Sequence, residues 1–241
     1  MQKCEVIRGL SLSIDEDFSK VKFSGDSKYL SRSKKDVVIV YEAPLMSMLP
    51  DEAGIKQPIK SEYIYDFCWH PKRNLLLTFN AKKEKKIDFS TIMIFEIPSR
   101  KRIFSATFAG LEIVAYEFNK SANLLAILCK TGDKNPQFSV KILDMSTNEI
   151  GSTTENLKPD KTQNYYTYLI AWVDTTLVIA GKFKENNLDT INVRFYKVNA
   201  SKNFFRLEAW NSDKNIKNYK ASHLIVSSNG VHFLLANIDR N

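Results

Sequence analysis

The chain has 241 residues, of which 44% are hydrophobic and 26% charged, proportions typical of a globular protein with a buried core. No run of about 18 apolar residues occurs and the N-terminus lacks the apolar stretch of a secretion signal, so we expect neither a membrane span nor secretion. Three scattered cysteines exclude a disulfide framework and favour a reducing, cytoplasmic location. The net charge of +8 favours acidic partners such as nucleic acid.

The predicted elements are short strands in groups of four, and the second group shows the pattern best. In "YDFCWHPKRNLLLTF" (65–79), alternation places Phe67 and Trp69 on one face of a strand and Cys68 and His70 on the other. The segment "HPKRN" then predicts a turn, and "LLLTF" predicts a second strand. After a lysine-rich loop, "NAKKEKKIDFS", a third strand is expected at "TIMIFEI" and a fourth at "IFSATF".

The same order of elements recurs along the chain. An earlier group opens at "VKFSGDSKYLSR", and later groups open at "AYEFNKSANLLAIL", "LIAWVDTTLVIAG" and "HLIVSSNGVHFLLAN". Two sets of anchor residues repeat in register, a coincidence that is hard to obtain by chance. On the first strand the anchors are Phe23, Trp69, Phe118, Trp172 and Val226, separated by 46, 49, 54 and 54 residues. On the third strand they are Tyr41, Phe95, Leu143 and Tyr196.

Four strands in each repeat of about 40–50 residues are the signature of a β-propeller blade. We therefore predict an all-β, WD40-like propeller with four four-stranded blades and a partial fifth, and we expect the anchors in the blade cores. The expected blades cover residues 20–60, 63–110, 113–157, 167–212 and 221–241. Either the partial blade pairs with a strand near "CEVIRGL" to close a small ring, or the chain is a segment of a larger propeller. We favour the segment because small propellers are less common.

Several segments resemble the B subunit of eukaryotic translation initiation factor 3. "VVIVYEAP" (37–44) resembles the "VYETP" step of that family, and "IKSEYIYDFCWHP" (59–71) is similar to its "I…E.I.DF.WSP" segment. "IFEIPSRKR" (94–102) is similar to its third strand and the following turn. "AWVDTTLVIAG…INVRFY" resembles its "FAWEP.G..FA…NVSFY" blade. The likeness runs in register over residues 23–196, most of the chain.

The resemblance implies a non-catalytic scaffold of translation initiation. It implies a larger propeller of which this chain would form about half, with the small ribosomal subunit (rRNA and ribosomal proteins) and other factor-3 subunits as partners. His70 stands where the family usually has Ser, Asp174 falls where "P.G" would make a turn, and the blade at Ala115 is only loosely similar. No segment matches the RNA-recognition-motif pattern. Contacts that the family makes through that domain or a helical tail are therefore not carried over.

Basic residues mark the candidate contacts to RNA. In a propeller the loops between second and third strands share one face, and here they carry charges of +2, +2, +1 and 0. Their side chains could hold phosphates, although surface loops are often lysine-rich for solvation alone. A rival cluster lies in turns of the opposite face, so charge does not choose a face. The candidates are Arg32, Lys34, Lys35, Lys82, Lys83, Lys85 and Lys86 on the first face and Arg100, Lys101 and Arg102 on the second.

Signals of catalysis are weak. Cys68 and His70 lie two residues apart, but the other cysteines and histidines form no second pair with zinc-ligand spacing. A thiol on the first strand of a blade is expected to be buried and unreactive. No nucleophile elbow, phosphate loop or dinucleotide fingerprint occurs. We expect no catalytic residue, metal, cofactor or small-molecule substrate.

Two aromatic clusters leave alternatives open. They could stack on RNA bases or contact a protein, or they could pack between blades, which we favour because large aromatics are usually buried. Three other functions stay possible: a propeller like translation initiation factor 2A, a WD-repeat scaffold that binds only proteins, and a hydrolase without its catalytic domain. The aromatic clusters are Tyr165, Tyr166 and Tyr168 before one first strand, and Phe204, Phe205 and Trp210 near an outer strand.

Overall fold

The fold is all-β throughout the described part of the chain. Within it the backbone forms twenty strands and no helix, so the predicted all-β fold class is confirmed. The described residues therefore contain no helix that could cross a membrane. A computed structural model describes residues 20–34, 36–43, 45–61, 63–84, 87–131, 136–152, 165–201, 204–209, 214–217, 223–227 and 232–236.

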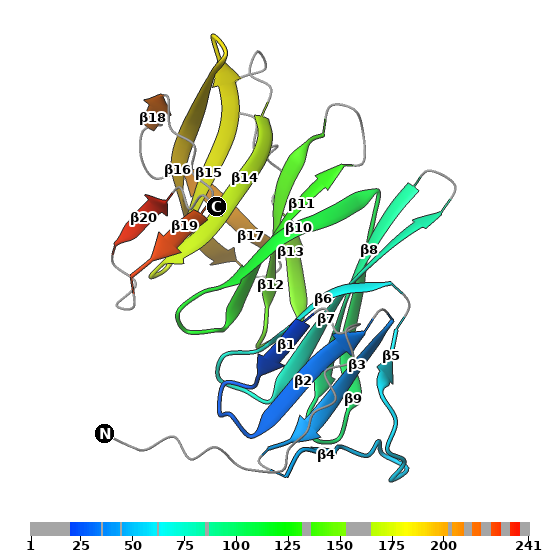
Figure 1. Cartoon of the computed structure of the whole chain (residues 1–241). Helices are drawn as coiled ribbons and strands as arrows, with labels where there is room; N and C mark the ends of the chain where they lie inside the picture. The colour runs from blue at the N-terminus through cyan, green and yellow to red at the C-terminus, as the bar shows by residue number, and fades with distance from the viewer. Residues whose placement is uncertain are drawn as a thin grey trace.

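The strands form five antiparallel sheets that follow one another along the chain (Figure 1). Sheet A contains β1 (Lys20–Phe23), β2 (Tyr29–Lys34), β3 (Val37–Glu42), β4 (Ser47–Met48) and β5 (Ile59–Lys60). Sheet B contains β6 (Ile64–Trp69), β7 (Leu75–Glu84), β8 (Ile87–Glu96) and β9 (Lys101–Ala109). Sheet C contains β10 (Leu111–Phe118), β11 (Leu124–Thr131), β12 (Phe138–Asp144) and β13 (Glu149–Ser152). Sheet D contains β14 (Tyr165–Val173), β15 (Thr176–Glu185), β16 (Leu188–Ser201), β17 (Phe204–Ala209) and β18 (Lys214–Lys217), and sheet E contains β19 (His223–Val226) and β20 (Phe233–Ala236).

In sheets A to D the first four strands pair in sequence order, as in a propeller blade. The fourth position is divided in two sheets, where β4 and β5 both pair with β3, and β17 and β18 both pair with β16. The expected blades begin at residues 20, 63, 113, 167 and 221, and the five sheets begin at Lys20, Ile64, Leu111, Tyr165 and His223. The proposed pairing strand near "CEVIRGL" lies outside the described residues.

Successive sheets pack face to face, with one apolar cluster in each of the four junctions A–B, B–C, C–D and D–E. Alternation sends neighbouring side chains to opposite junctions. On β7, Leu76 packs in the A–B junction, whereas Leu75 and Leu77 pack in the B–C junction. On β15, Leu177 packs in the C–D junction and Val178 in the D–E junction. Because burial of one such side chain stabilises by about 2 kcal/mol, apolar contact dominates each junction.

Each sheet therefore has a rear face, directed toward the preceding sheet, and a forward face, directed toward the next. Phe67 and Trp69 lie on the rear face of sheet B and Cys68 lies on its forward face, which confirms the predicted alternation. The anchor residues share the rear face of their sheets. Six of them are buried and two are half-buried: Tyr41, Trp69, Phe95, Leu143, Trp172 and Tyr196, and then Phe118 and Val226.

Phe23 is the exception among the anchors. It is 60% exposed, so its predicted place in a blade core is wrong. The equivalent Trp69 is 7% exposed because its rear face meets sheet A. No sheet among the described residues lies behind sheet A, and the Phe23 ring is therefore left without the layer that covers its counterparts.

The two anchor tryptophans also bond to the sheet behind them. The indole Nε1 of Trp69 donates to Ser31 Oγ at 2.7 Å and lies 3.3 Å from the Lys22 carbonyl. The indole of Trp172 donates to the Glu117 carbonyl at 2.9 Å. Lys22 directly precedes the anchor Phe23 in sheet A, and Glu117 directly precedes the anchor Phe118 in sheet C. The same indole-to-carbonyl contact therefore recurs in the A–B and C–D junctions. A buried indole needs such an acceptor, which fixes its orientation.

The lysine-rich segment after Phe79 is mostly strand. The sequence predicts a loop there, but β7 continues to Glu84 and β8 begins at Ile87, with Lys83 opposite Asp88. The ladder continues past the apolar residues because backbone bonds do not depend on side-chain polarity. A second long hairpin, β15–β16, turns at Asn186 and Asn187 with φ of 51° and 64°, the left-handed pair of a type I′ turn.

Candidate interaction site

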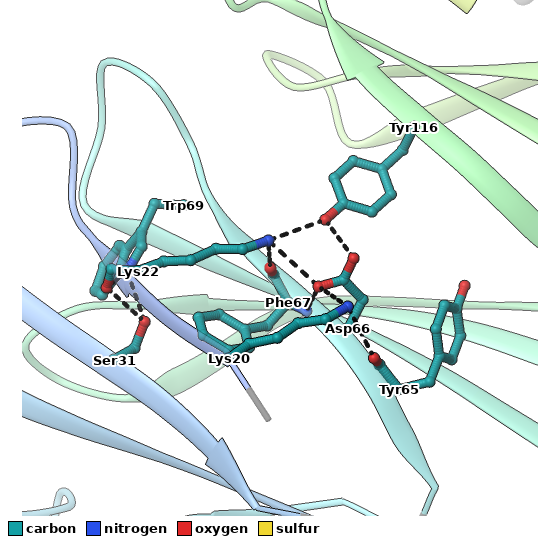
Figure 2. A network of polar contacts seen from close by, with 8 residues as sticks. All are labelled: Lys20, Lys22, Ser31, Tyr65, Asp66, Phe67, Trp69 and Tyr116. Carbon is teal, nitrogen blue, oxygen red and sulfur yellow. Dashed lines mark hydrogen bonds and ion pairs between the residues drawn. The ribbon is translucent and has the colours of Figure 1, made fainter. Parts of the chain in front are cut away.

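A polar network joins the first strands of sheets A, B and C (Figure 2). Lys20 and Lys22 of β1 reach Asp66 of β6, with Nζ–Oδ1 distances of 3.0 and 3.3 Å. Tyr116 of β10 donates its hydroxyl hydrogen to Asp66 Oδ2 at 2.9 Å. Lys22 also donates to the Phe67 carbonyl at 2.5 Å. One carboxylate of sheet B thus gathers donors from sheets A and C.

The network is an ionic link rather than an acid–base pair. Burial acts to raise the pKa of the Asp66 carboxyl, but the hydrogen bond from Lys20 and the charge of Lys22 outweigh it and hold the pKa below its usual value. Burial raises the pKa of Tyr116, and the Asp66 carboxylate raises it further. At neutral pH the carboxylate is ionised and the phenol is neutral, so neither group is poised to transfer a proton.

Bulges interrupt the first strands beside this network. Register shifts leave Tyr65 in β6 and Val114 in β10 as extra residues, each 40% exposed. A bulge turns its extra side chain out of the regular alternation. The Tyr65 hydroxyl donates to the Ile113 carbonyl at 3.1 Å, so the bulge of sheet B contacts that of sheet C. Sequence reasoning missed both bulges because only one residue of β6 and three of β10 precede them, too few for the break in alternation to show.

His70 organises the turn between β6 and β7. Its Nδ1 accepts hydrogen bonds from the backbone N–H groups of Lys72 at 3.1 Å and Arg73 at 3.0 Å. These bonds require an unprotonated Nδ1, so the proton lies on Nε2, which donates to the Ala122 carbonyl of sheet C at 2.8 Å. Burial lowers the pKa of His70, and the charge of Arg73 lowers it further. Arg73 also donates from Nη2 to the Met145 carbonyl at 2.7 Å, a second link to sheet C.

Cys68 does not share this environment. Its side chain packs in the B–C junction, and burial raises the pKa of its thiol to about 12. Burial raises the pKa of Cys129 to about 12 as well. Because the thiolate is the reactive form, both side chains act as small apolar groups at neutral pH. In the described part of the chain, no group of three or more His, Cys, Asp or Glu residues is placed to hold a metal.

A small polar pocket of about 360 Å³ lies where the β1–β2 turn meets the β6–β7 turn. A Cβ added at Gly25 would lie 2.2 Å from the Pro71 carbonyl oxygen, so only glycine permits this approach. The lining offers two cations and one carboxylate, without a nucleophile or a pair of carboxylates. It consists of Gly25, Asp26, Pro71, Lys72, Arg73 and Asn74.

The candidate basic residues fall at two ends of the sheets. In each antiparallel sheet the first and third turns lie at one end, here called the turn end, and the second–third hairpin lies at the other, the hairpin end. Lys101 and Arg102 are exposed at the turn end. Arg100 is half-buried beside them and donates from Nη1 to the Leu49 carbonyl at 3.1 Å, so it ties sheet B to sheet A.

The hairpin-end candidates are less well placed. Arg32 lies within β2 rather than in a loop, with its guanidinium 5.1 Å from the centre of the Tyr41 ring. Lys34 is the half-buried last residue of β2. Lys82 and Lys83 belong to the backbone of β7. Their side chains lie outside the described residues, as do Lys35, Lys85 and Lys86.

The tyrosine cluster lies inside a first strand and not before it, since β14 begins at Tyr165. Tyr168 is 6% exposed and packs against Phe138 with ring centroids 4.6 Å apart, which favours packing between sheets over stacking on RNA. The side chains of the other aromatic candidates lie outside the described residues. These are Tyr165, Tyr166, Phe204, Phe205 and Trp210.

Comparison with solved structures decides the fold. The propeller of Dos1 is 12% identical with a TM-score of 0.50 and covers 88% of this chain and 51% of its own. The β-propeller domain of the Trilobed protease from Pyrococcus furiosus is 14% identical with a TM-score of 0.50, covering 88% and 60%. The fold is that of a β-propeller segment. A complex of the fission yeast SREBP–SCAP binding domains matches the segment over 98% of its length, with 11% identity and a TM-score of 0.50.

Sequence comparison indicates a relation to the B subunit of eukaryotic translation initiation factor 3. This propeller segment is 25% identical to that protein of Bombyx mori over 230 residues, 90% of this chain and 30% of the relative. The Drosophila willistoni protein is 24% identical over 227 residues, with coverage of 91% and 31%. The segment therefore spans less than a third of the length of these relatives. No known family model matches the sequence.

Proposed function

We propose that this propeller segment is a non-catalytic scaffold of translation initiation that docks on the small ribosomal subunit and organises other subunits of initiation factor 3. The observation that carries the proposal is the likeness to the factor-3 B subunit over 90% of the chain. It runs through consecutive sheets, so it concerns the framework and not one motif. The cytoplasm, where initiation takes place, is the location that follows.

The geometry suits a rigid platform. Every junction is filled by an apolar cluster, and the A–B and B–C junctions add ionic and hydrogen-bonded links at the first strands. A rigid framework holds its surface residues in fixed positions without ordering them on binding, which lowers the entropic cost of association. Positioning of other components is therefore the mechanism, with no turnover.

The turn end is the better candidate for rRNA phosphates. Lys72, Lys101 and Arg102 are exposed there, whereas the hairpin-end candidates with described side chains, Arg32 and Lys34, are half-buried. Phosphate contacts of this kind add affinity that falls as salt rises. We therefore assign the ribosomal contact to the turn end.

The test is co-sedimentation with purified small ribosomal subunits at low and moderate salt. A turn-end variant, Lys101→Glu with Arg102→Glu, should lose most of the salt-sensitive pelleting. The matched control, Lys60→Glu with Lys184→Glu, removes the same charge at two exposed sites toward the hairpin end and should pellet like wild type. A second variant with Lys82, Lys83, Lys85 and Lys86 changed to Glu tests the hairpin end.

Equal loss in the turn-end variant and the control would show that only net charge matters, and the assignment to the turn end would fail. Folded wild type that stays in the supernatant at both salts would exclude ribosome docking by this segment. A scaffold that binds only proteins would then be the better description. Its supporting observation is that an exposed apolar side chain, Ile103, directly follows the basic Lys101 and Arg102 on β9.

A further inference from the structure

The polar pocket at the turn end, between the β1–β2 turn and the β6–β7 turn, has the size and lining of a ligand site. Its volume of about 360 Å³ lies near the lower limit of such sites, which run from about 300 to 1,000 Å³, so it suits a small polar group. The two turns meet through backbone, because a Cβ at Gly25 would lie 2.2 Å from the Pro71 carbonyl oxygen. Charged side chains from both turns line the space: Asp26 from one, and Lys72 and Arg73 from the other.

The carboxylate of Asp26 is satisfied within its own turn. Its Oδ1 accepts hydrogen bonds from Ser24 Oγ at 2.7 Å and from the Lys28 backbone N–H at 3.1 Å. Its Oδ2 lies 3.8 Å from Lys28 Nζ. The hydrogen bond from Ser24 holds the pKa of Asp26 below its usual value, so the carboxylate is ionised at neutral pH and the Lys28 ammonium balances its charge.

The two cations of the opposite turn have no such counter-charge. Lys72 and Arg73 are both exposed, and neither forms an ion pair with a described carboxylate. Among the described residues, no group accepts a hydrogen bond from Lys72 Nζ or from Arg73 Nη1. With Asp26 balanced by Lys28, the pocket carries an excess of two positive charges, which attracts an anion.

The site is also held in shape before a ligand arrives. His70 Nδ1 accepts hydrogen bonds from the backbone N–H groups of Lys72 and Arg73, which fixes the turn. Arg73 Nη2 donates to the Met145 carbonyl at 2.7 Å, so one side of the guanidinium is anchored to sheet C while Nη1 stays available to a ligand. Because these groups are ordered in the free protein, binding costs less conformational entropy.

We propose that this pocket binds a phosphate group, with Arg73 and Lys72 as its cationic ligands. A tetrahedral phosphate presents oxygens in several directions, so a guanidinium and an ammonium on adjacent residues can each bond to one of them. The missing side chain at Gly25 lets the group approach the backbone of the facing turn closely. The phosphate belongs either to an RNA chain, a case that rests on the proposed function, or to a small monoester such as a nucleotide.

The first test is an NMR titration of the isotope-labelled chain with inorganic phosphate and with adenosine monophosphate at constant ionic strength. The amide signals of Gly25 and of residues 72–74 should shift and saturate in the millimolar range. Arg73→Gln and Lys72→Gln should each weaken binding by about tenfold, the usual loss for one hydrogen bond to a charged group. Lys72 contributes only its backbone to the turn, so its substitution leaves the fold intact. The matched control, Lys60→Gln, removes the same charge at an exposed site on β5 and should bind like wild type.

Asp26→Asn distinguishes an anionic ligand from a cationic one. The amide keeps a side-chain oxygen for the Ser24 and Lys28 donors and removes the negative charge, so phosphate affinity should rise by about threefold. Weaker phosphate binding by this variant would overturn the proposal. Adenosine without phosphate that shifts the same signals as strongly would also overturn it, as would millimolar phosphate that leaves the Gly25 signal of wild type unmoved.

A short RNA without terminal phosphates identifies the source of the phosphate. Binding of this RNA that Arg73→Gln weakens would place a phosphodiester in the pocket, whereas binding of adenosine monophosphate alone would assign the pocket to a free monoester. Ribosome co-sedimentation gives a separate result. Wild type that fails to pellet but binds phosphate would contradict only the proposed function, and wild type that pellets while phosphate leaves Gly25 unmoved would contradict only the assignment of this pocket.

Discussion

The A–B and C–D junctions solve the same packing problem with different residues. Both bury an apolar cluster, and both receive an indole hydrogen bond from the anchor tryptophan. Three residues before each first-strand anchor, however, sheets A and B carry Lys20 and Asp66, whereas sheets C and D carry Ala115 and Leu169. Lys20 and Asp66 form an ion pair, whereas Ala115 and Leu169 pack against apolar clusters.

This contrast indicates that the fold requires apolar alternation and an anchor, but not polar links. A polar network is an addition that fixes how particular sheets meet, because its donors and acceptors must be matched in three dimensions. Four predictions test the contrast, in decreasing order of expected effect.

Gly25→Ala should break the A–B junction at its turns. The new Cβ would meet the Pro71 carbonyl oxygen at 2.2 Å, and backbone must move on one side or the other. We expect a loss of about 1–3 kcal/mol in the free energy of unfolding, measured by urea denaturation. Gly54→Ala is the control, since no atom lies within 4 Å of its added Cβ and only the left-handed φ of 79° opposes it. Equal losses would show that the close approach is not what constrains Gly25.

Replacing the anchor tryptophans with Phe should cost more at Trp69 than at Trp172. Trp69→Phe leaves the buried Ser31 hydroxyl without its indole donor, whereas Trp172→Phe removes the bond to one carbonyl. An unmade buried hydrogen bond costs about 1–2 kcal/mol beyond the packing loss that the two variants share. Urea midpoints of the two variants compare the junctions directly. A larger loss for Trp172→Phe would contradict the account of the A–B junction.

Asp66→Asn should destabilise by about 1 kcal/mol near neutral pH, because its lysine partners are partly exposed and the ion pairs are screened. Since the folded pKa of Asp66 lies below its ordinary value of 3.8, its contribution is present above that value and is lost as pH falls through the folded pKa. Thermal melts from pH 2 to pH 7 should show the stability difference between the two proteins shrinking as pH falls below 3.8. A difference that stays constant over this whole range would mean that the carboxylate charge is not responsible.

His70→Ser should remove a smaller pH dependence at the β6–β7 turn. The imidazole is used in its neutral form, and its folded pKa lies below the ordinary 6.5. Its contribution is therefore present above 6.5 and declines as pH falls toward the folded pKa, since the unfolded chain takes up the proton first. We expect wild type to lose stability below about pH 6.5 in urea titrations and the variant to lose less. Parallel curves for the two proteins would contradict the use of a neutral imidazole at this turn.

The repeat analysis predicted the fold because its signals are local and recur. Apolar alternation around Trp69 correctly separated the residues of the A–B junction from Cys68 in the B–C junction. The same reasoning could not find the Asp66 network, whose members come from strands almost a hundred residues apart. The only trace in the sequence is that a strand of otherwise apolar character, "VKF", is preceded and interrupted by lysines.

The basic residues show a similar limit. Sequence placed Arg100, Lys101 and Arg102 together in one cluster, and the structure separates them, since Arg100 donates to the Leu49 carbonyl while the other two stay exposed. Which cation is used for packing depends on whether a carbonyl of another sheet lies within reach. The carbonyl of the other sheet comes within reach only when the chain folds, and the local sequence around Arg100 does not reveal it.

Alternation is a property of one extended chain, so the amino-acid sequence was enough to specify the period, the order of the first strands in each sheet and the face on which side chains such as Phe67, Cys68 and Trp69 lie. Which of those faces are covered depended on the tertiary structure. Phe23 and Trp69 hold the same place in the repeat, yet one is 60% and the other 7% exposed. Burial depends on the layer behind a strand, and for Phe23 no described sheet provides one.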